Sequence, residues 1–546
     1  LFPTAENAST MRLKAADLLA GNGEMDKAIK ICIELTLDSK VKPEEQAAAA
    51  IAAAEFSASQ KKWNEAEKFC RFVDNLKCSA TITGQGLFLM GEMRLKRQLY
   101  RAAADVFLEL ANKNSDWEAK SRYEAARALE MAGEPVMVLA EVKKLLVMSK
   151  LPAELIPGIL YMDAAALDRL DRDKEAIGVF AEMAKKYPTH KLADDAMFTA
   201  GRLAFASGDY ALAAKCFEEF ATGAFAKSKF APNALYKGIY ADVFRKNNDA
   251  AAKKIAVLRK QYPESEFTAA AMFRQADELF AAGRYDAALN VLADMEEVFK
   301  KNKNIMPRIL SAQMSAHAKL GNTINALKLL DLTQKNYPDF TGLSEMLFLA
   351  GDLASKAGDY DKAREYFQAV PPLRPGSLLA AAAHGRAGDS LFALYNKTFS
   401  KQYLKAAELE YLEILKIKNI PSLIRVQTDY KLGRCYEIEY QQIRATDEND
   451  EKVKAQRRQT LDYYNSAVFA GVPDVGAVKE AEKIWMVKAA YAAARIYSEH
   501  KGRKKIAEKD IQSAIGIYQL LRKLRLDTGE DFDALIIELK RKARRE

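Results

Sequence analysis

Cysteine and histidine are the side chains of this 546-residue chain best suited to metal or nucleophilic chemistry. The five cysteines and four histidines are Cys32, Cys70, Cys78, Cys216, Cys435, His190, His317, His384 and His500. No histidine has another histidine or a cysteine at ligand spacing, and no Cys-x-x-Cys pair occurs. An odd number of cysteines also cannot all pair internally. We therefore expect no metal site.

Signatures of catalysis are missing from the sequence as well. It contains neither a Walker-type glycine-rich loop nor a Gly-x-Ser-x-Gly motif. The stretch from Gly385 to Gly388 is too short to cradle a phosphate. We expect a non-enzymatic protein without a cofactor or a small-molecule substrate.

The composition indicates that helices must position any site. Alanine is common, whereas glycine (26) and proline (15) are sparse, which favours helices because glycine and proline have the lowest helix propensities. No window long enough to cross a membrane is free of charged residues, so we expect no transmembrane helix. The chain begins Leu1-Phe2-Pro3 without methionine, which is compatible with a removed export signal or lipid anchor.

A short turn followed by alanine five residues later recurs about every 37 residues. The turn positions are Gly23, Lys61, Gln98, Gly133, Asp171, Gly208, Asn247, Gly283, Gly321, Gly358 and Lys401. The alanine column reads Ala28, Ala66, Ala103, Val138, Ala176, Ala213, Ala252, Ala288, Ala326, Ala363 and Ala406. Glycine, asparagine and aspartate tolerate a left-handed backbone, which ends many helices. Each turn is therefore predicted to join two helices.

Two further columns predict how the helices cross. Seven residues before the turn, most units carry alanine or glycine, as at Gly91, Gly201 and Gly351. Nine residues after it, most carry a large apolar residue, and Cys32 and Cys70 fall in this column. A small residue lets two helices approach closely. We predict an all-α fold, an α–α superhelix of about 13 helix–turn–helix repeats.

The stretches Gly201–Phe217 and Ala276–Leu292 resemble the consensus of the tetratricopeptide repeat family, and the resemblance extends over residues 11–418. It implies a solenoid whose first helices line a concave groove that takes a peptide or a partner helix. The family's usual period is shorter, and the extra residues follow Tyr-Pro pairs at Tyr187, Tyr262 and Tyr337. This feature resembles bacterial envelope members such as BamD and CpoB.

The spacing changes after residue 418, so we predict an array over 1–418 (about 11 units) and atypical repeats with basic capping helices over 419–546. Gly433 fits the small column, Tyr464 and Ala467 fit the second helix, and Thr460 takes the alanine position. The charged stretch 446–454 is predicted to be a loop, and helices are expected from Trp485 to about His500 and over 509–526. The last 46 residues carry 13 basic and eight acidic residues.

Candidate partner-binding residues lie in two columns of the first helices. They are Phe88, Glu92, Tyr123, Arg127, Phe198, Arg202, Asp277 and Asp352. The simpler interpretation of the aromatic residues is packing between repeats, and that of the charged ones is a solvated face. As a binding surface, they predict a groove that is arginine-lined in its N-terminal half and acidic in its C-terminal half. The lysine–asparagine clamp of chaperone-binding members is missing at the matching positions.

The leading hypothesis is a non-enzymatic scaffold that binds a protein or peptide partner, periplasmic or outer-membrane-associated in a bacterium, with a cytoplasmic location as the alternative. A second hypothesis is a structural subunit of a larger assembly, docking through its long C-terminal helices. A third, less favoured, is binding of nucleic acid or anionic lipid through the basic C-terminus.

Overall fold

The computed structural model describes residues 8–76, 78–444, 450–469, 479–498, 508–523 and 531–544. These residues form 27 α-helices and a short 3-10 helix, and no β-strand occurs among them. The predicted all-α solenoid of helix–turn–helix repeats is confirmed. No described helix is both long enough and apolar enough to cross a membrane.

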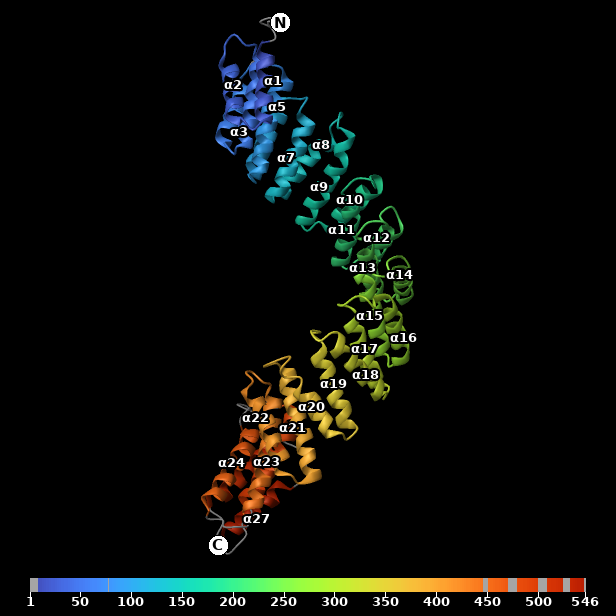
Figure 1. Cartoon of the computed structure of the whole chain (residues 1–546), viewed down its shortest axis with the longest axis vertical. Coiled ribbons are helices and arrows are strands. Elements are labelled where there is room, and N and C mark those ends of the chain that lie inside the picture. Colours follow the sequence, from blue (N-terminus) through green and yellow to red (C-terminus); the bar gives the residue numbers. More distant parts are fainter. Residues whose placement is uncertain are drawn as a thin grey trace. The chain divides into compact units, whose positions relative to one another are not determined.

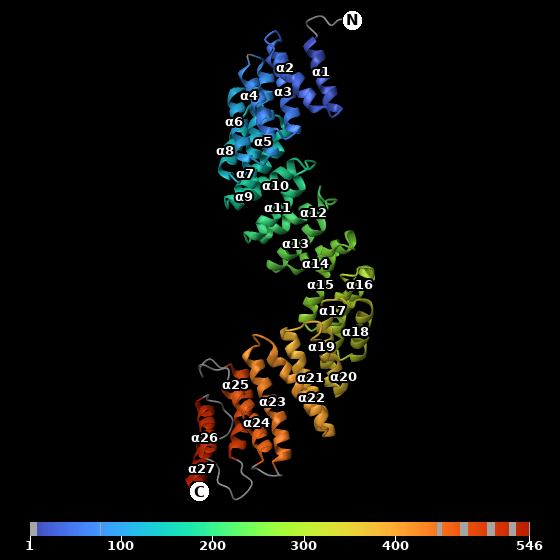
Figure 2. The same ribbon diagram turned by 60° about the vertical axis from the view of Figure 1, so that its left-hand side comes forward.

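The contacts divide the chain into two units, Leu1–Ala271 and Met272–Glu546. In the first unit each helix packs on its neighbours along the chain, first and second helices alternating (Figure 1, Figure 2). Its helices are α1 (Ala8–Gly21), α2 (Met25–Leu37), α3 (Pro43–Ser59), α4 (Trp63–Asn75), α5 (Ala80–Lys96), α6 (Tyr100–Lys113), α7 (Glu118–Ala132), α8 (Pro135–Leu146), η2 (Ala153–Leu155), α9 (Ile156–Arg169), α10 (Asp173–Lys186), α11 (Ala193–Ala206), α12 (Tyr210–Thr222), α13 (Ala231–Phe244) and α14 (Asn248–Gln261). The boundary between the units falls within α15 (Glu266–Ala281).

The second unit continues the alternation and ends in longer helices. Its helices are α16 (Tyr285–Phe299), α17 (Met306–Lys319), α18 (Thr323–Asn336), α19 (Leu343–Lys356), α20 (Tyr360–Gln368), α21 (Leu378–Thr398), α22 (Lys401–Lys416), α23 (Ser422–Ile443), α24 (Glu451–Phe469), α25 (Glu480–Ser498), α26 (Glu508–Lys523) and α27 (Phe532–Arg544). The predicted boundary at residue 418 falls in the loop between α22 and α23 and stays a prediction.

Nine of the eleven predicted turn positions have a positive φ, including the non-glycine residues Lys61, Gln98 and Asp171. Two predictions were wrong. The left-handed residue before α14 is Lys246, because Asn247 instead caps α14 by accepting a hydrogen bond from the Ala250 amide at 3.1 Å. The one before α22 is Phe399, because Lys401 is already helical.

The alanine column is buried at nine of its eleven positions, and the other two follow the shifted turns. Ala251 is buried where Ala252 was expected, and Ala407 is buried where Ala406 was expected. A small side chain at this position lets the second helix of each pair lie close to the first.

The small and large columns meet where the two helices of a pair cross. A Cβ atom added to Gly201 would lie 2.7 Å from a ring carbon of Phe217, which leaves no room for a methyl group. Gly91 faces Phe107 and Gly351 faces Phe367 in the same way. Four pairs with a smaller opposite residue have alanine at this position, namely Ala16 and Cys32, Ala54 and Cys70, Ala126 and Val142, and Ala276 and Leu292.

The C-terminal repeats keep this crossing despite their stretched spacing. Gly433 faces the Tyr464 ring as predicted, and Thr460 is fully buried. Residues 451–454, predicted as loop, form the first turn of α24, whereas residues 445–449 lie outside the described part. His500 and parts of the basic C-terminal segment lie outside it as well.

Candidate functional site

We define the first-helix face as the side chains six and ten residues before each left-handed turn residue. The position ten residues before the turn is mostly a packing position. Phe88 is 8% exposed, with its ring 5.2 Å from those of Phe107 and Trp117. The Phe198 ring lies 5.7 Å from the Phe217 and Phe230 rings. Tyr123 packs its hydroxyl against Gly158 of the next first helix. These aromatic candidates therefore join neighbouring repeats.

The position six residues before the turn carries charge that segregates along the first unit. Its members are Asp17, Glu55, Glu92, Arg127, Ala165, Arg202 and Tyr240. The sign changes from acidic on α1, α3 and α5 to basic on α7 and α11. The expected arginine-lined N-terminal half is thus wrong for its first three repeats, because that expectation left out Asp17 and Glu55.

Asp17, Glu55 and Glu92 form what we call the acidic row. All three are exposed, and none has an ion-pair partner within the part of the chain that the structure describes. Burial, followed by the charges of Asp17 and Glu92, raises the pKa of Glu55. Asp17 and Glu92 therefore repel the Glu55 carboxylate from the neighbouring first helices, a repulsion that Lys96 offsets in part and that a cationic partner would reduce further.

The basic members of the column have weak partners. Arg127 pairs with Glu124 on its own helix at 2.9 Å, and Arg202 lies 3.5 Å from Asp168 with about half of its side chain exposed. Burial, with a contribution from Glu92, raises the pKa of Glu124 even though Arg127 lowers it. Exposed pairs of this kind contribute about 0.2–1 kcal/mol, so either arginine can exchange its partner at little cost.

A cleft of about 500 Å³ opens on this face beside Arg202. Side chains of α11, α12, α13 and the start of α15 line it, and we call it the basic–aromatic cleft. The lining residues are Arg202, Phe205, Phe217, Asn233, Tyr236, Lys237, Tyr240 and Phe267. Of the candidates predicted from the sequence, it contains Arg202.

The sequence prediction missed the α13 side of this cleft because it placed the turn after α13 at Asn247 rather than at Lys246. Counted from Lys246, Tyr236 and Tyr240 occupy the two first-helix-face positions. Their hydroxyls are 3.1 Å apart, and the Tyr236 ring lies 5.8 Å from the Phe267 ring. The N-capping preference of Asn247 was the sequence signal that could have placed them.

The second unit carries the other two charged candidates. Burial raises the pKa of Asp277, while Arg308 lowers it. Asp352 pairs with Arg386 at 2.8 Å. These two carboxylates thus face arginines of their own unit, unlike the acidic row.

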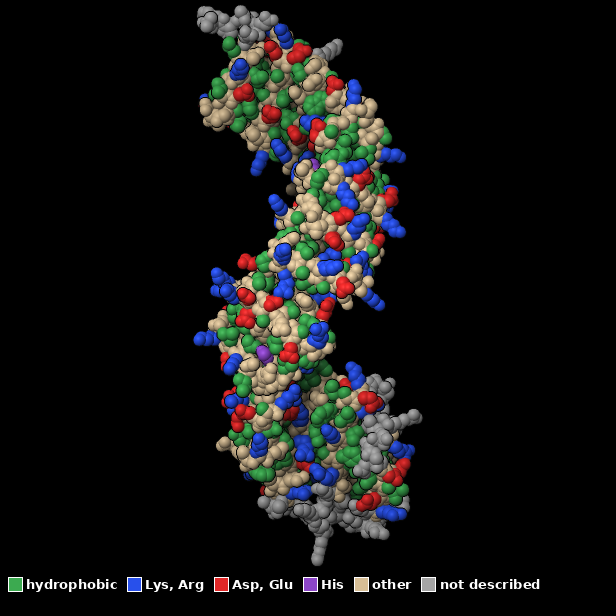
Figure 3. Space-filling view, turned by 90° about the vertical axis from the view of Figure 1, so that its right-hand side faces the viewer, with side chains coloured by type: hydrophobic (Ala, Val, Ile, Leu, Met, Phe, Trp, Pro, Cys, Tyr) green, Lys and Arg blue, Asp and Glu red, His purple; other side chains and the backbone are tan. Residues whose placement is uncertain are grey.

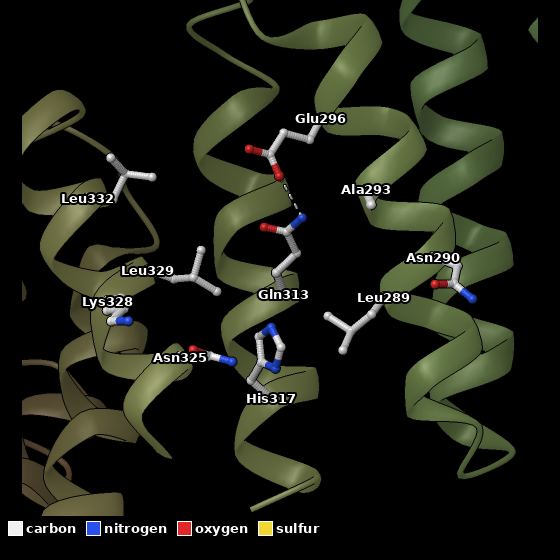
Figure 4. A pocket seen from close by; sticks show the side chains of 10 residues that line it. All are labelled: Leu289, Asn290, Ala293, Glu296, Gln313, His317, Asn325, Lys328, Leu329 and Leu332. Atoms are coloured by element: carbon white, nitrogen blue, oxygen red, sulfur yellow. Dashed lines mark hydrogen bonds between the residues drawn. The ribbon is translucent and has the colours of Figure 1, made fainter. Parts of the chain in front are cut away.

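A second cleft, of about 550 Å³, lies between the second helices α16 and α18 of the second unit. Gln313 and His317 project into it from α17, and Gln313 donates to Glu296 at 2.9 Å (Figure 4). The buried Nδ1 of His317 has no hydrogen-bond partner among the described residues. Leu289, Leu329 and exposed polar side chains complete a mixed lining.

The second helices of the first unit carry charges of both signs that pair between neighbouring repeats, as Arg71 does with Glu109 and Lys185 with Glu219. In the view of Figure 3, basic and acidic side chains are interspersed over the surface rather than gathered by sign. A mixed surface of this kind serves solubility. Segregated, poorly paired charge beside an aromatic cleft is instead typical of a surface that recognises a partner.

The cysteines do not form a site. All five are free, and Cys32, Cys70, Cys216 and Cys435 are buried. Burial raises the pKa of Cys32 to about 11 and that of Cys70 to about 12. Among the described residues, no group of three or more His, Cys, Asp or Glu side chains could hold a metal ion.

Comparisons with known proteins match one short stretch of the chain to a family model and find solved structures of low similarity. No curated protein matches the chain. The structure of Naa15/Naa10 bound to HypK-THB matches at 12% identity, covering 99% of this chain and 91% of that one, with a TM-score of 0.34. The C-terminal part of a TPR repeat-containing protein from Cytophaga hutchinsonii matches at 15% identity, covering 49% of this chain and 95% of that one, with a TM-score of 0.34. A tetratricopeptide repeat protein from Parabacteroides merdae matches at 12% identity, covering 57% of this chain and 98% of that one, with a TM-score of 0.29.

The family match lies in α19 and α20. Residues 345–371 match the model of the tetratricopeptide repeat. They contain the small residue Gly351, the left-handed Gly358 and the ring of Phe367, which together make one helix crossing. This match supports a tetratricopeptide-repeat family for the chain, and that fold suggests a protein-interaction scaffold.

Proposed function

We propose that this protein is a non-enzymatic scaffold that binds a segment of a partner chain on the first-helix face of its first unit. The observation that carries the proposal is the segregation of charge on that face. Asp17, Glu55 and Glu92 lie without ion pairs on one part of it, as far as the described residues extend, and Arg202 borders a cleft on another. Surfaces that hold poorly paired charge at the expense of stability are typical of binding sites.

The helices beneath the face are suited to hold it rigid. Phe107, Phe180 and Phe217 are at most 2% exposed and fill the crossings between first and second helices. Bidentate pairing of Arg71 with Glu109, at 2.7 and 2.9 Å, joins the second helices α4 and α6. A preformed surface spares the complex the ordering cost of the receptor, which improves affinity without further contacts.

A displayed library of random peptides, selected on the full chain, tests the proposal. Selected peptides should bind the wild type and lose most of their binding to a Glu92→Lys/Arg202→Glu variant, because both reversals lie on the first-helix face. The matched control reverses Glu65 and Lys215, which are exposed on the second helices α4 and α12. Peptides that bind the first-helix variant as well as the wild type would contradict the proposal.

A structural role through the C-terminal helices is the second candidate function. Phe469 of α24 is 53% exposed, Ile484 of α25 57% and Ile537 of α27 51%. Exposed apolar side chains on a terminal repeat suit a permanent contact. Light scattering of the isolated chain distinguishes this role, because such a surface should drive self-association that Phe469→Ser and Ile484→Ser reduce. A monomer at every concentration would contradict it.

The proposed location is the bacterial cell envelope, periplasmic or associated with the outer membrane. It rests on the Tyr-Pro pairs at the ends of α10, α14 and α18 and on their likeness to BamD- and CpoB-type repeats. Fractionation of the native organism, followed by immunodetection of the chain, tests it. Recovery with the cytoplasmic fraction would contradict it.

A further inference from the structure

We propose that the basic–aromatic cleft binds a partner segment in which an acidic residue adjoins an aromatic or large aliphatic side chain. This inference rests on the proposed function, since it specifies which segment the first-helix face of the first unit takes. It also gives that segment a direction, with its acidic, apolar part in the cleft and a basic part over the acidic row.

The apolar requirement follows from the rings that line the cleft. Phe217 is fully buried, while Phe205, Tyr236 and Phe267 are half-buried and present their rings to the opening. The Phe205 ring also lies 5.6 Å from that of Phe244, which is 56% exposed. Rings left partly open to water are stabilised when an apolar group covers them, and contacts between aromatic rings add to this stabilisation.

The acidic requirement follows from the polar groups at the same opening. Arg202 of α11 and Lys237 of α13 bring two positive charges to it, and Asn233 adds an amide. Lys237 has no acidic partner within the described residues, and Arg202 has only the exposed Asp168 at 3.5 Å. A guanidinium binds a carboxylate through two parallel hydrogen bonds, and an ammonium adds a point charge. No described carboxylate neutralises both cations, so an incoming one is the natural partner.

The direction follows from the charge along the face. Two first helices, α7 and α9, lie between α5, which bears the acidic Glu92, and α11, which bears the basic Arg202. A segment with one acidic and one basic part is attracted at both ends in one direction. In the reverse direction each part of the segment meets like charge, and this repulsion disfavours the wrong orientation.

Fluorescence anisotropy with the full chain and two labelled peptides tests the cleft. The first peptide is Asp-Glu-Phe-Glu-Asp, and in the second serine replaces phenylalanine. The first should bind more tightly than the second. Arg202→Gln and Lys237→Gln should each weaken its binding about tenfold or more, since a hydrogen bond to a charged group is worth about 1.5–3 kcal/mol. Lys215→Gln, on the second helix α12, is the matched control and should change nothing.

Three results would overturn the inference. Equal binding of both peptides would remove the apolar requirement, and inorganic phosphate competing as well as the peptide would reduce the cleft to a general anion site. Tighter binding of a Lys-Lys-Phe-Lys-Lys peptide at the cleft would reverse the assigned charge.

The direction is tested with a longer peptide that joins the acidic block to a tetralysine block through a Gly-Ser linker. Joining should raise the affinity above that of the acidic block, and Glu55→Gln/Glu92→Gln should abolish only this gain. No gain would refute the direction alone. If library peptides bind the first-helix face but the acidic–aromatic peptide does not, this inference fails while the proposed function stands.

Discussion

Replacing Gly201 by alanine tests the packing rule on which the whole solenoid depends. The added Cβ would lie 2.7, 2.9 and 3.0 Å from three ring carbons of Phe217. That ring is fully buried, so it cannot move away into solvent. Gly201→Ala is therefore expected to destabilise the pair formed by α11 and α12.

The magnitude follows from two opposing terms. Alanine has a higher helix propensity than glycine, by about 1 kcal/mol, whereas overpacking a full core costs about 1–3 kcal/mol. The difference is a net loss of up to about 2 kcal/mol at Gly201. Gly178→Ala is the matched control, because Gly178 is exposed on α10 and an added Cβ would meet nothing within 4 Å. That variant should gain about 1 kcal/mol.

Other repeats of the chain suggest a compensating change. Glycine faces a ring at Gly91, Gly201, Gly351, Gly388 and Gly433, whereas Ala276 occupies the same position opposite Leu292. Phe217→Leu should therefore relieve Gly201→Ala, with a coupling energy of about 1–2 kcal/mol in the double-mutant cycle. Ala164 with Phe180 departs from this pattern, and nothing in the structure explains it.

Urea unfolding of the full chain followed by circular dichroism measures the stability change. Repeat arrays need not unfold as a single unit, so hydrogen exchange of the α11 and α12 amides should report the local effect. If both glycine variants stabilise the protein equally, or if the double variant shows no coupling, the packing rule is refuted.

Three further predictions concern strain, thiol reactivity and pH. Phe399, which is 75% exposed, has a φ of 55°. Phe399→Gly should raise the free energy of unfolding by about 1 kcal/mol, because a left-handed backbone costs a bulky residue about that much. Urea unfolding measures this change, and a loss of stability would contradict the explanation. A thiol reagent applied to the native chain near pH 8 should label Cys78 first, because burial raises the pKa of the other four thiols. Rapid labelling of the Cys78→Ser variant would show this prediction to be wrong. The Arg71 hydrogen bonds lower the pKa of Glu109 to about 2, so the stabilisation that this pair provides is complete above about pH 4.3 and is lost as the pH falls towards 2. Arg71→Met should therefore flatten the acid limb of the stability curve, and an unchanged acid limb would contradict the pairing.

The pairing of helices could be predicted from the sequence because it depends on residues close together in the chain. Gly201 and Phe217 are 16 residues apart, and the turn and cap between them are set by Gly208 and Asp209. Even the stretched unit with Gly433 and Tyr464 was placed correctly, since a small residue opposite a large one is readable from residue size alone. The same reasoning placed Cys32 and Cys70 in the core.

The register of α13 needed the tertiary structure. Asparagine suits both a left-handed turn and a helix N-cap. Asn247 serves as the cap, which leaves the left-handed conformation to Lys246, a residue type that gives no such signal. The one-residue shift brings Tyr236 and Tyr240 into the first-helix face, so the wrong register concealed most of the cleft's aromatic lining.

What the sequence alone determined is the repeat: which residues cross, where most helices end, and which faces the first helices present. What only the tertiary structure decided is how side chains from different repeats combine. The basic–aromatic cleft brings Arg202 together with Phe267, and the acidic row brings Asp17 towards Glu55, each pair separated by at least one full repeat. The physical reason is that pair packing is a local property of neighbouring helices, whereas a cleft or a shared electrostatic field depends on the relative positions of several helices.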